Sequence, residues 1–376
     1  MKVKPQVSVF LAALALGSSG LILPGRAFTL AGAIAATPVP CQVFVLVSKP
    51  SSSYAVGMRE IRQALASRGV PANFTLFDFD HRTSRGMTAL ARIRKGHFKL
   101  VIAMGSEATA FLWAHYRNGR LPVVTAIAKD PVLMGLVKTY DAGSGTNFAF
   151  TSLNVPVVLQ MQYIEELLPN LKNLAVMFSP KNKSAVQTQY LPLLPVGPRF
   201  GVRILAVSAG AHDVAGELRR AMPEAITEMR QTDPDLRASA FWITGSTEIF
   251  DQIHLIDTLA GRIPVLSAVP DVVKPGPDSA TVAIGVTFED DGYLAGLYAA
   301  DILSGRADPA TMKVGVVSPP DIAISFLKAH EDRLEIPFDF FELASFVYDR
   351  HGRPVRLNGQ AVHVQRVLAA PGHPRS

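Results

Sequence analysis

The chain has 376 residues, of which 48% are hydrophobic and 18% are charged, and this length favours two globular domains over one. Its formal net charge is +6, yet no cluster of lysines and arginines is interleaved with aromatic residues, so nucleic-acid binding is not expected. The single cysteine, Cys41, excludes an internal disulfide.

The first residues have the order of a secretory signal peptide. A short basic start, residues 1–4, precedes an almost entirely apolar stretch, 7–23, and small residues follow near Ala27 and Ala36. We therefore predict a signal peptide over residues 1–36 and a periplasmic location, with cleavage after Ala27 or after Ala36 left open. An uncleaved membrane anchor is the alternative, because the apolar stretch is nearly long enough to cross a bilayer.

Cys41 directly follows Pro38-Val39-Pro40, which fits poorly with the small apolar residues that precede a lipidated cysteine. We expect a thiol at the start of the first strand, and lipid anchoring at Cys41 is not expected. Removal of the three basic residues of the leader lowers the net charge from +6 to +3, which weakens the argument for a polyanionic partner further.

The first half of the chain alternates predicted strands with predicted helices. Residues 42–48 form a continuous apolar run rich in valine, which is typical of a buried parallel strand. Further strands are predicted at 73–79, 100–104 and 123–127, and helices over 54–67, 87–94 and 107–116 separate them. This alternation predicts a parallel sheet covered by helices on both faces.

The second half repeats the alternation. A strand at 147–151 is followed by Asn154-Val155-Pro156 and a helix through Leu168. Strands at 174–178, 203–207, 240–244 and 265–268 come next, with helices near 184, over 214–230 and over 248–259. We take the strand at 280–285 and the helix over 287–303 as a return to the first lobe, before a strand at 313–317 and a helix over 322–330. The predicted division is 41–154 plus 280–311 for lobe 1, 155–279 plus 312–348 for lobe 2, and a loosely ordered tail over 349–376.

Four short segments recur in the same order in both halves. Residues 46–56 are similar to 176–186, and Arg68-Gly69-Val70 is similar to Phe200-Gly201-Val202. Met104-Gly105-Ser106 is echoed by Thr244-Gly245-Ser246, and Leu121-Pro122-Val123 by Ile263-Pro264-Val265. Two similar α/β lobes would place two sets of strand-end loops opposite each other, with a small ligand between them. The alternative is that any two doubly wound domains share apolar strands followed by glycine and serine.

No sequence signature of catalysis is present. The chain has no glycine-rich phosphate loop, no Gly-x-Ser-x-Gly nucleophile elbow and no His-Glu-x-x-His metal helix. Asp78, Asp80 and His81 could supply metal ligands, although we favour a polar turn after a strand. Glu165 and Glu166 are adjacent on a helix and point to different faces, which argues against a catalytic carboxylate pair. We therefore expect no enzymatic activity, no metal and no cofactor.

Polar and aromatic residues at the strand ends are the candidate ligand contacts. Hydroxyls and N–H groups at helix starts bind carboxylates, carboxylates receive amines, and rings enclose apolar parts of a ligand. The candidates are Ser52, Ser53, Tyr54, Ser106, Glu107, Lys129, Asp130, Asn182, Ser246, Thr247, Asp271 and Phe288. The alternatives are helix capping for Ser106 and Ser246, a turn at Asp130, and a surface position or an ion pair across the hinge for Lys129.

Several segments resemble one known family. In the first half they are Asp130-Pro131-Val132-Leu133-Met134-Gly135-Leu136, Gly145-Thr146-Asn147 and Glu166-Leu167-Leu168-Pro169-Asn170-Leu171-Lys172. In the second half they are Arg262-Ile263-Pro264-Val265, Ala283-Ile284-Gly285-Val286 and Gly292-Tyr293-Leu294-Ala295-Gly296. Over roughly residues 43–337 the chain resembles the ABC-transporter substrate-binding protein family that includes tryptophan- and tyrosine-binding lipoproteins.

The resemblance implies a type I periplasmic binding protein fold, in which two Rossmann-like α/β lobes with parallel sheets flanked by helices are joined by a three-segment hinge. It also implies a ligand between the lobes and delivery to a membrane permease that a separate ATPase drives. The chain departs from the family where Lys129 replaces a small residue, and where Phe148-Ala149-Phe150 replaces a Val-Thr-Gly run.

The expected function is that of the exported solute-binding component of an ABC uptake system. It would bind a small organic ligand, such as an amino acid, in the cleft between the lobes, and would act as a monomer. The alternative is an exported sensor subunit of the same fold that signals to a membrane partner. A hydrolase is disfavoured because the nucleophile motif is missing.

Overall fold

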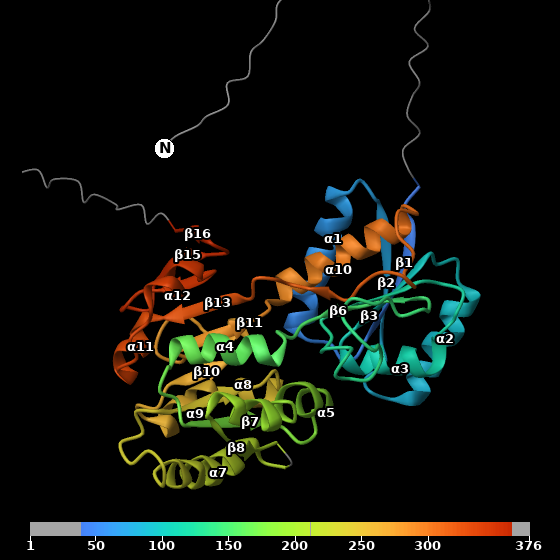
Figure 1. Cartoon of the computed structure of the whole chain (residues 1–376). Helices are drawn as coiled ribbons and strands as arrows, with labels where there is room; N and C mark the ends of the chain where they lie inside the picture. Colours follow the sequence, from blue (N-terminus) through green and yellow to red (C-terminus); the bar gives the residue numbers. More distant parts are fainter. Residues whose placement is uncertain (1–38, 211, 363–376) are drawn as a thin grey trace, which may run out of the picture. The chain divides into compact units, whose positions relative to one another are not determined.

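The computed structural model describes residues 39–210 and 212–362, which form two large sheets with helices on their faces and a small two-stranded sheet (Figure 1). The predicted signal peptide, residues 1–36, lies outside the described residues, as does 363–376. Within the described part of the chain, none of the helices combines the length and the apolar composition that a membrane span requires.

The first sheet has five parallel strands. Their order is β2 (Ala72–Asp78), β1 (Cys41–Val47), β3 (Leu100–Met104), β4 (Val123–Ala126) and β5 (Phe148–Ala149). Helices α1 (Ser52–Ser67) and α10 (Phe288–Leu303) cover one face, and α2 (Thr83–Lys95) and α3 (Ser106–Tyr116) cover the other. On β1, Val43 and Val45 enter the core under α1 and α10, while Phe44 and Leu46 enter the opposite core. Burial on both faces explains the uninterrupted apolar run of this strand. We call this part the first lobe.

The second sheet has nine strands and belongs to the second lobe. Their order is β16 (Gln360–Ala361), β15 (Pro354–Leu357), β14 (Phe346–Tyr348), β13 (Asp321–Ser325), β11 (Val282–Gly285), β10 (Val265–Ser267), β9 (Ser239–Ile243), β7 (Asn173–Phe178) and β8 (Arg203–Ser208). Helices α4 (Val157–Leu167) and α12 (Phe338–Leu343) cover one face, and α7 (Val214–Met229) and α9 (Ile253–Ala260) the other. The neighbouring residues Phe241 and Trp242 on β9 enter the two opposite cores, as the alternation of a strand requires.

The chain passes between the lobes three times, from β6 (Thr151–Ser152) to α4, from β11 to α10, and from β12 (Gly315–Val316) to β13. Strands β6 and β12 pair in parallel, so the first and third connections lie side by side. The remaining elements are short: α5 (Lys183–Ala185), η1 (Val186–Tyr190), α6 (Leu193–Val196), η2 (Gly197–Phe200), α8 (Thr247–Phe250), η3 (Pro270–Val272) and α11 (Phe326–Asp332).

Two strands lie in different sheets from those that the sequence predicted. The strand at 280–285 was expected in the first lobe, but β11 pairs with β10 and β13 in the second sheet, and the chain returns only with α10. Val282 and Ile284 are buried in the core under α4, which holds this strand in the second lobe. Residues 312–316 were expected in the second lobe, but β12 pairs with β6 beside the first lobe.

Two further segments have a different type of secondary structure from the one predicted. The helix expected over 322–330 is strand β13 followed by α11, because Ile322 and Ile324 are buried in the second core. The tail expected to be loosely ordered contains β15 and β16, which extend the second sheet by antiparallel pairing. Arg356 on β15 also donates from Nη1 to the carbonyl oxygens of Phe341 and Ala344.

Helices α1 and α10 approach each other at glycines. A Cβ atom at Gly292 would lie 2.7 Å from Cα of Gly57, and one at Gly296 would lie 2.9 Å from Cα of Ile61. Both obstructing atoms belong to the backbone, so a side chain at either position would force the helices apart. The contact matters for the cavity described below, because α10 follows directly on the second crossing between the lobes.

We predict that Gly296→Val lowers the free energy of unfolding by about 2 kcal/mol or more, since overpacking a close contact typically costs 1–3 kcal/mol. Chemical denaturation followed by circular dichroism would measure the change. Gln63→Ala on the exposed face of α1 is the control and should change stability by less than about 0.5 kcal/mol. Equal stability of the two variants would contradict a backbone-to-backbone contact between α1 and α10.

Candidate functional site

A cavity of about 670 Å³ is lined by residues from both lobes. The first lobe contributes the loops that follow β1, β2, β3 and β4, and the second lobe contributes those that follow β7, β9 and β10. These are the carboxyl ends of parallel strands, where α/β folds commonly bind ligands. Leu153 at the first crossing between the lobes, together with Val286 and Phe288 at the second, completes the lining.

The start of α1 supplies two predicted contacts. Ser51 caps the helix by accepting a hydrogen bond from the backbone N–H of Tyr54 at 3.2 Å, and Ser53 and Tyr54 line the cavity. Burial, assisted by the charge of Glu107, raises the pKa of the Tyr54 hydroxyl to about 12, so the phenol stays neutral. Gly105, with φ of +94°, leaves room for this hydroxyl, because a Cβ atom there would overlap it.

The loop after β4 is held by two hydrogen bonds from other elements. Ser106 accepts through Oγ from the backbone N–H of Lys129 at 3.0 Å, and Asp291 on α10 accepts through Oδ2 from the N–H of Ile127 at 2.5 Å. Ile127 has φ of +53°, which is strained for a β-branched residue. Burial raises the pKa of the Asp291 carboxyl to about 6. The cavity wall at Ile127 therefore depends on a contact with α10.

Lys129 is a buried cation that faces the cavity. Its side chain is almost enclosed, with the residue 8% exposed, and its Nζ lies so close to Gly245 of the second lobe that a Cβ atom there would overlap it. Burial lowers the pKa of the Lys129 ammonium to about 8, while the charge of Glu107 acts in the opposite direction. Lys129 Nζ makes no hydrogen bond or ion pair with any residue of 39–210 and 212–362.

The second-lobe wall is built around Asn182. Its Oδ1 accepts from the N–H of Ala185 at 3.0 Å and from the hydroxyl of Ser184 at 2.9 Å, while its Nδ2 donates to the carbonyl of Gly245 at 3.3 Å. The N–H of Gly245 donates to Oε1 of Gln189 at 2.7 Å. The loop that faces Lys129 is thus fixed by its own side-chain contacts.

The cavity contains charges of both signs. Its cationic side chains are Lys49, Lys129 and Lys181, and its acidic ones are Glu107, Glu248 and Asp251. Rings and aliphatic groups, among them Phe250 and Leu153, supply apolar wall. A site of this composition suits a small ligand that carries charged and apolar parts together.

Eight of the twelve predicted contacts line the cavity, and they come from both lobes. They are Ser53, Tyr54, Ser106, Glu107, Lys129, Asn182, Thr247 and Phe288. Ser52 is exposed at the first turn of α1 and lies outside the lining, as does Asp271 in η3.

The side chains of the other two predicted contacts, Asp130 and Ser246, form hydrogen bonds within the protein. Asp130 forms a turn by accepting from the N–H groups of Val132 at 2.8 Å and Leu133 at 3.1 Å, and it also accepts from the Tyr140 hydroxyl. Ser246 is fully buried and accepts through Oγ from the N–H of Ser179 at 3.3 Å. Both side chains therefore already have hydrogen-bond partners within the protein.

Several lining residues were missed by the sequence reasoning. Lys49 and Lys181 follow the corresponding strands β1 and β7, and both lie within the repeated segments 46–56 and 176–186, so the repeat could have pointed to them. His81, Glu248 and Asp251 also line the cavity, without a comparable sequence signal. They come from loops whose direction only the folded chain fixes.

The segment with Asp78, Asp80 and His81, considered above for metal ligands, contains local polar contacts. No group of three or more histidine, cysteine, aspartate or glutamate side chains is arranged for a metal ion within 39–210 and 212–362. Oδ1 of Asp78 accepts from the N–H of Asp80 at 2.8 Å, and Asp80 pairs with Arg82 at 3.2 Å, as in the polar turn that we favoured at these positions.

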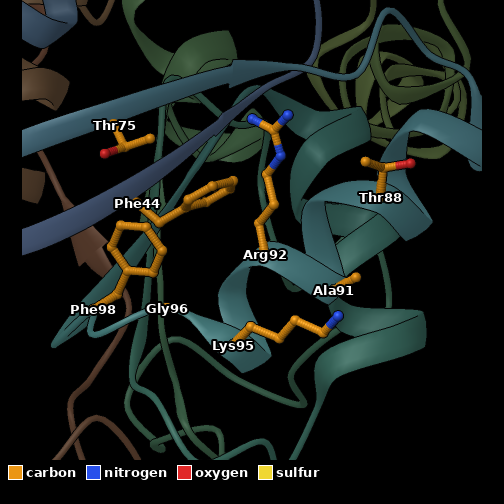
Figure 2. Close-up of a pocket in the computed structure, with 8 residues that line it drawn as sticks. All are labelled: Phe44, Thr75, Thr88, Ala91, Arg92, Lys95, Gly96 and Phe98. Carbon is orange, nitrogen blue, oxygen red and sulfur yellow. The ribbon is translucent and has the colours of Figure 1, made fainter.

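A second hollow lies on the first lobe between the edge strand β2 and helix α2 (Figure 2). The rings of Phe44 and Phe98 meet edge to face at 5.1 Å on one side of it, and Arg92 rises beside them (Figure 2). Its lining is almost entirely apolar apart from the basic residues Arg92 and Lys95, and it contains no acidic residue. This hollow lacks the convergent polar groups of the cavity between the lobes.

Comparison with known proteins agrees with the geometry. Residues 41–339 match the family described as ABC transporter substrate binding protein. No curated protein sequence matches the chain. The solved structure of the ABC domain in complex with L-Trp from Streptococcus pneumoniae is 20% identical, covers 81% of this chain and 99% of its own, and has a TM-score of 0.62.

Two further solved structures have the same fold. A conserved domain protein from Vibrio cholerae is 18% identical, with 82% of this chain and 100% of that chain covered and a TM-score of 0.63. The ligand-free, open structure of a substrate-binding protein with adhesive properties from Clostridium difficile is 18% identical, with coverage of 82% and 99% and a TM-score of 0.63. With the two-lobed α/β fold and the match over residues 41–339, the chain belongs to the ABC transporter substrate-binding protein family.

Proposed function

We propose that this protein is the exported solute-binding component of an ABC uptake system and that it holds a small organic ligand in the cavity between its lobes. The observation that carries the proposal is the cavity itself, because strand-end loops of both lobes contribute polar side chains to it. A ligand that contacts both walls stabilises one arrangement of the lobes relative to others.

The three crossings between the lobes support a hinge mechanism. The first and third crossings, after β6 and after β12, run beside each other through the β6–β12 pair, and the second crossing leads from β11 into α10. Few connecting residues would have to change conformation for the lobes to move as bodies. We propose that closure of the lobes around the ligand presents the surface that a membrane permease recognises.

Binding rather than catalysis suits the chemistry of the cavity. Ser106 accepts a hydrogen bond from the backbone of Lys129, and no serine–histidine hydrogen bond occurs among the described residues, although His81 is part of the lining. Nucleophilic catalysis needs a hydroxyl paired with a base. The family to which the chain belongs is one of binding proteins, which points in the same direction.

The ligand class follows from the mixed composition of the walls. Cations and carboxylates would receive the charged ends of an amino acid, and Tyr54, Phe250 and Phe288 would enclose its side chain. The Streptococcus pneumoniae structure of the same fold was solved with L-Trp, so aromatic amino acids are the first compounds to test.

We predict that ligand-free protein, prepared by unfolding and refolding, gains thermal stability with at least one member of a library of amino acids and organic acids. A ligand at 100 times its Kd adds about 2.7 kcal/mol to the stability of the folded state. Differential scanning fluorimetry would detect the shift, and mass spectrometry would identify what co-purifies with untreated protein. A library without any stabilising member, together with an empty co-purified sample, would refute the proposal.

A pair of adjacent serines offers a matched test of the cavity. Ser53 lines it and Ser52 does not. We predict that Ser53→Ala raises the Kd for the identified ligand by roughly 3- to 10-fold, because one hydrogen bond contributes about 1 kcal/mol, while Ser52→Ala leaves the Kd unchanged. Isothermal titration calorimetry would give both values. An equal effect of the two substitutions would argue against the cavity as the binding site.

A ligand-uptake assay in whole cells distinguishes a transport function from a sensor function of the same fold. Loss of the protein should abolish accumulation of the radiolabelled ligand in whole cells. Normal accumulation combined with a lost transcriptional or signalling response would instead support the sensor alternative, with the same cavity in use.

A further inference from the structure

We infer that Lys129 binds a carboxylate of the ligand, so that the protein selects small carboxylic acids over their neutral analogues. This inference rests on the proposed function, since it names the class of ligand that the same cavity takes.

The backbone around Lys129 is fixed, so its side chain starts from a defined position. The N–H of Lys129 donates to Ser106 Oγ at 3.0 Å, and the N–H of Leu153 donates to the carbonyl of Ala128 at 2.8 Å. From this loop of the first lobe the side chain extends to Gly245 of the second lobe. The ammonium therefore lies inside the cavity and against its far wall.

A comparison with Lys328 shows what is missing at Lys129. Both lysines are buried, but Lys328 forms ion pairs with Asp257 at 2.5 Å and with Glu331 at 2.7 Å. Within the described residues Lys129 has no such partner, and Glu107 lines the same cavity without an ion pair to it. A buried ammonium is costly unless an anion contacts it directly, and the charge of Glu107 acts on Lys129 without such contact. The ligand is therefore the group left to supply a contacting anion.

A hydroxyl near the same loop is also available to the ligand. Ser106 uses its oxygen to accept from Lys129, and its hydroxyl hydrogen has no acceptor among residues 39–210 and 212–362. Ser106 is the first residue of α3, where the helix dipole favours a negative charge. An ammonium and a hydroxyl together suit the two oxygens of a carboxylate.

The other charges of the cavity favour a single negative charge. The acidic groups Glu107, Glu248 and Asp251 would repel a phosphate dianion more strongly than a carboxylate. The cations Lys49 and Lys181 are exposed, in contrast to Lys129, and solvent therefore screens them. His81 and the neutral Tyr54 hydroxyl complete the titratable groups of the lining.

The depressed basicity of Lys129 gives the binding a defined pH dependence. Without ligand, the pKa of the Lys129 ammonium is about 8, and a bound carboxylate raises it. Below pH 8 the lysine is already charged, whereas above pH 8 it must take up a proton in order to bind the carboxylate. The Kd for an acid should therefore rise about tenfold per pH unit above pH 8 until the pKa of the complex is reached.

The test compares acids with their amides on three proteins. The probes are phenylacetate with phenylacetamide, and L-phenylalanine with its amide, together with the corresponding pair for any co-purified acid. The proteins are wild type, Lys129→Met and, as a control, Lys183→Met, whose lysine is exposed and outside the lining. We expect wild type and the Lys183 variant to bind acids at least roughly 10-fold more tightly than amides, and the Lys129 variant to lose this preference.

A spectroscopic readout makes the result independent of the ligand's identity. Lysine side-chain NMR, with the Lys129 signal assigned from its absence in Lys129→Met, would follow its pKa in sodium acetate, in acetamide, and in sodium chloride of equal ionic strength. We expect acetate alone to raise the pKa. Lys129→Gln provides a second substitution in case the methionine variant is poorly folded.

The outcomes separate this inference from the proposed function. Tight binding of acids and amides alike, or an acid preference that survives in Lys129→Met, would overturn the carboxylate assignment and leave the cavity's function intact. An unchanged Lys129 pKa in acetate would do the same. Failure of every compound to bind, with nothing co-purified, would overturn the proposed function and this inference together.

Titration from pH 7 to pH 9.5 provides the final measurement. The loss of affinity above pH 8 should be present in wild type and absent in Lys129→Met, which retains the other titratable groups of the cavity. The same pH profile in both proteins would assign the effect to another group and refute the role of Lys129.

Discussion

Two glycines at the ends of corresponding strands leave space for polar side chains that line the cavity. Gly105 follows β3 and Gly245 follows β9, and each lies so close to the polar end of a side chain that an added Cβ atom would overlap it. At Gly105 the group is the hydroxyl of Tyr54, from the same lobe. At Gly245 it is the ammonium of Lys129, from the opposite lobe. The glycine at this position of the repeat thus leaves space for a side chain in both lobes, but the side chain is Tyr54 in one case and Lys129 in the other.

The cavity wall is linked to the packing of two helices in the first lobe. Asp291 accepts a hydrogen bond from the N–H of Ile127, whose backbone conformation is strained. The next residue, Gly292, is the point at which α10 approaches Gly57 of α1. A strained residue of this kind costs about 1–3 kcal/mol and persists only where surrounding contacts hold it. The close helix contact therefore positions Asp291, and Asp291 in turn positions the loop that carries Lys129.

Buried charged side chains are paired elsewhere in the fold, whereas a buried lysine in the cavity is not paired with any described residue. On α11, Lys328 forms ion pairs with Asp257 of α9 and with Glu331. Asp332 of the same helix accepts a hydrogen bond at 2.5 Å from Thr281, which directly precedes β11. In the cavity, Lys129 Nζ forms no ion pair with any described residue, and the Ser106 hydroxyl hydrogen has no acceptor among them. Groups that the fold leaves unsatisfied in an enclosed space are the ones that a ligand can complete.

The amino-acid sequence by itself determined the alternation of strands and helices, the two-lobed fold class and most of the strands of both sheets. These follow from local patterns, because a strand buried on both faces must be apolar throughout and a helix must carry an apolar stripe. Eight of the twelve predicted contacts lie in the cavity, because the carboxyl ends of parallel strands converge on one edge.

Only the tertiary structure decided which sheet receives β11 and β12, and which polar side chains remain free. Strand pairing joins residues that are far apart in the chain, and the apolar sequence of β11 is compatible with either sheet. Its pairing with β10 and β13 places it in the second sheet. Asp130 and Ser246 looked equivalent to Lys129 and Ser106 in the sequence. Asp130 accepts hydrogen bonds within its own turn, and Ser246 accepts one from the loop after β7. The Lys129 ammonium instead extends into a space that residues of both lobes line.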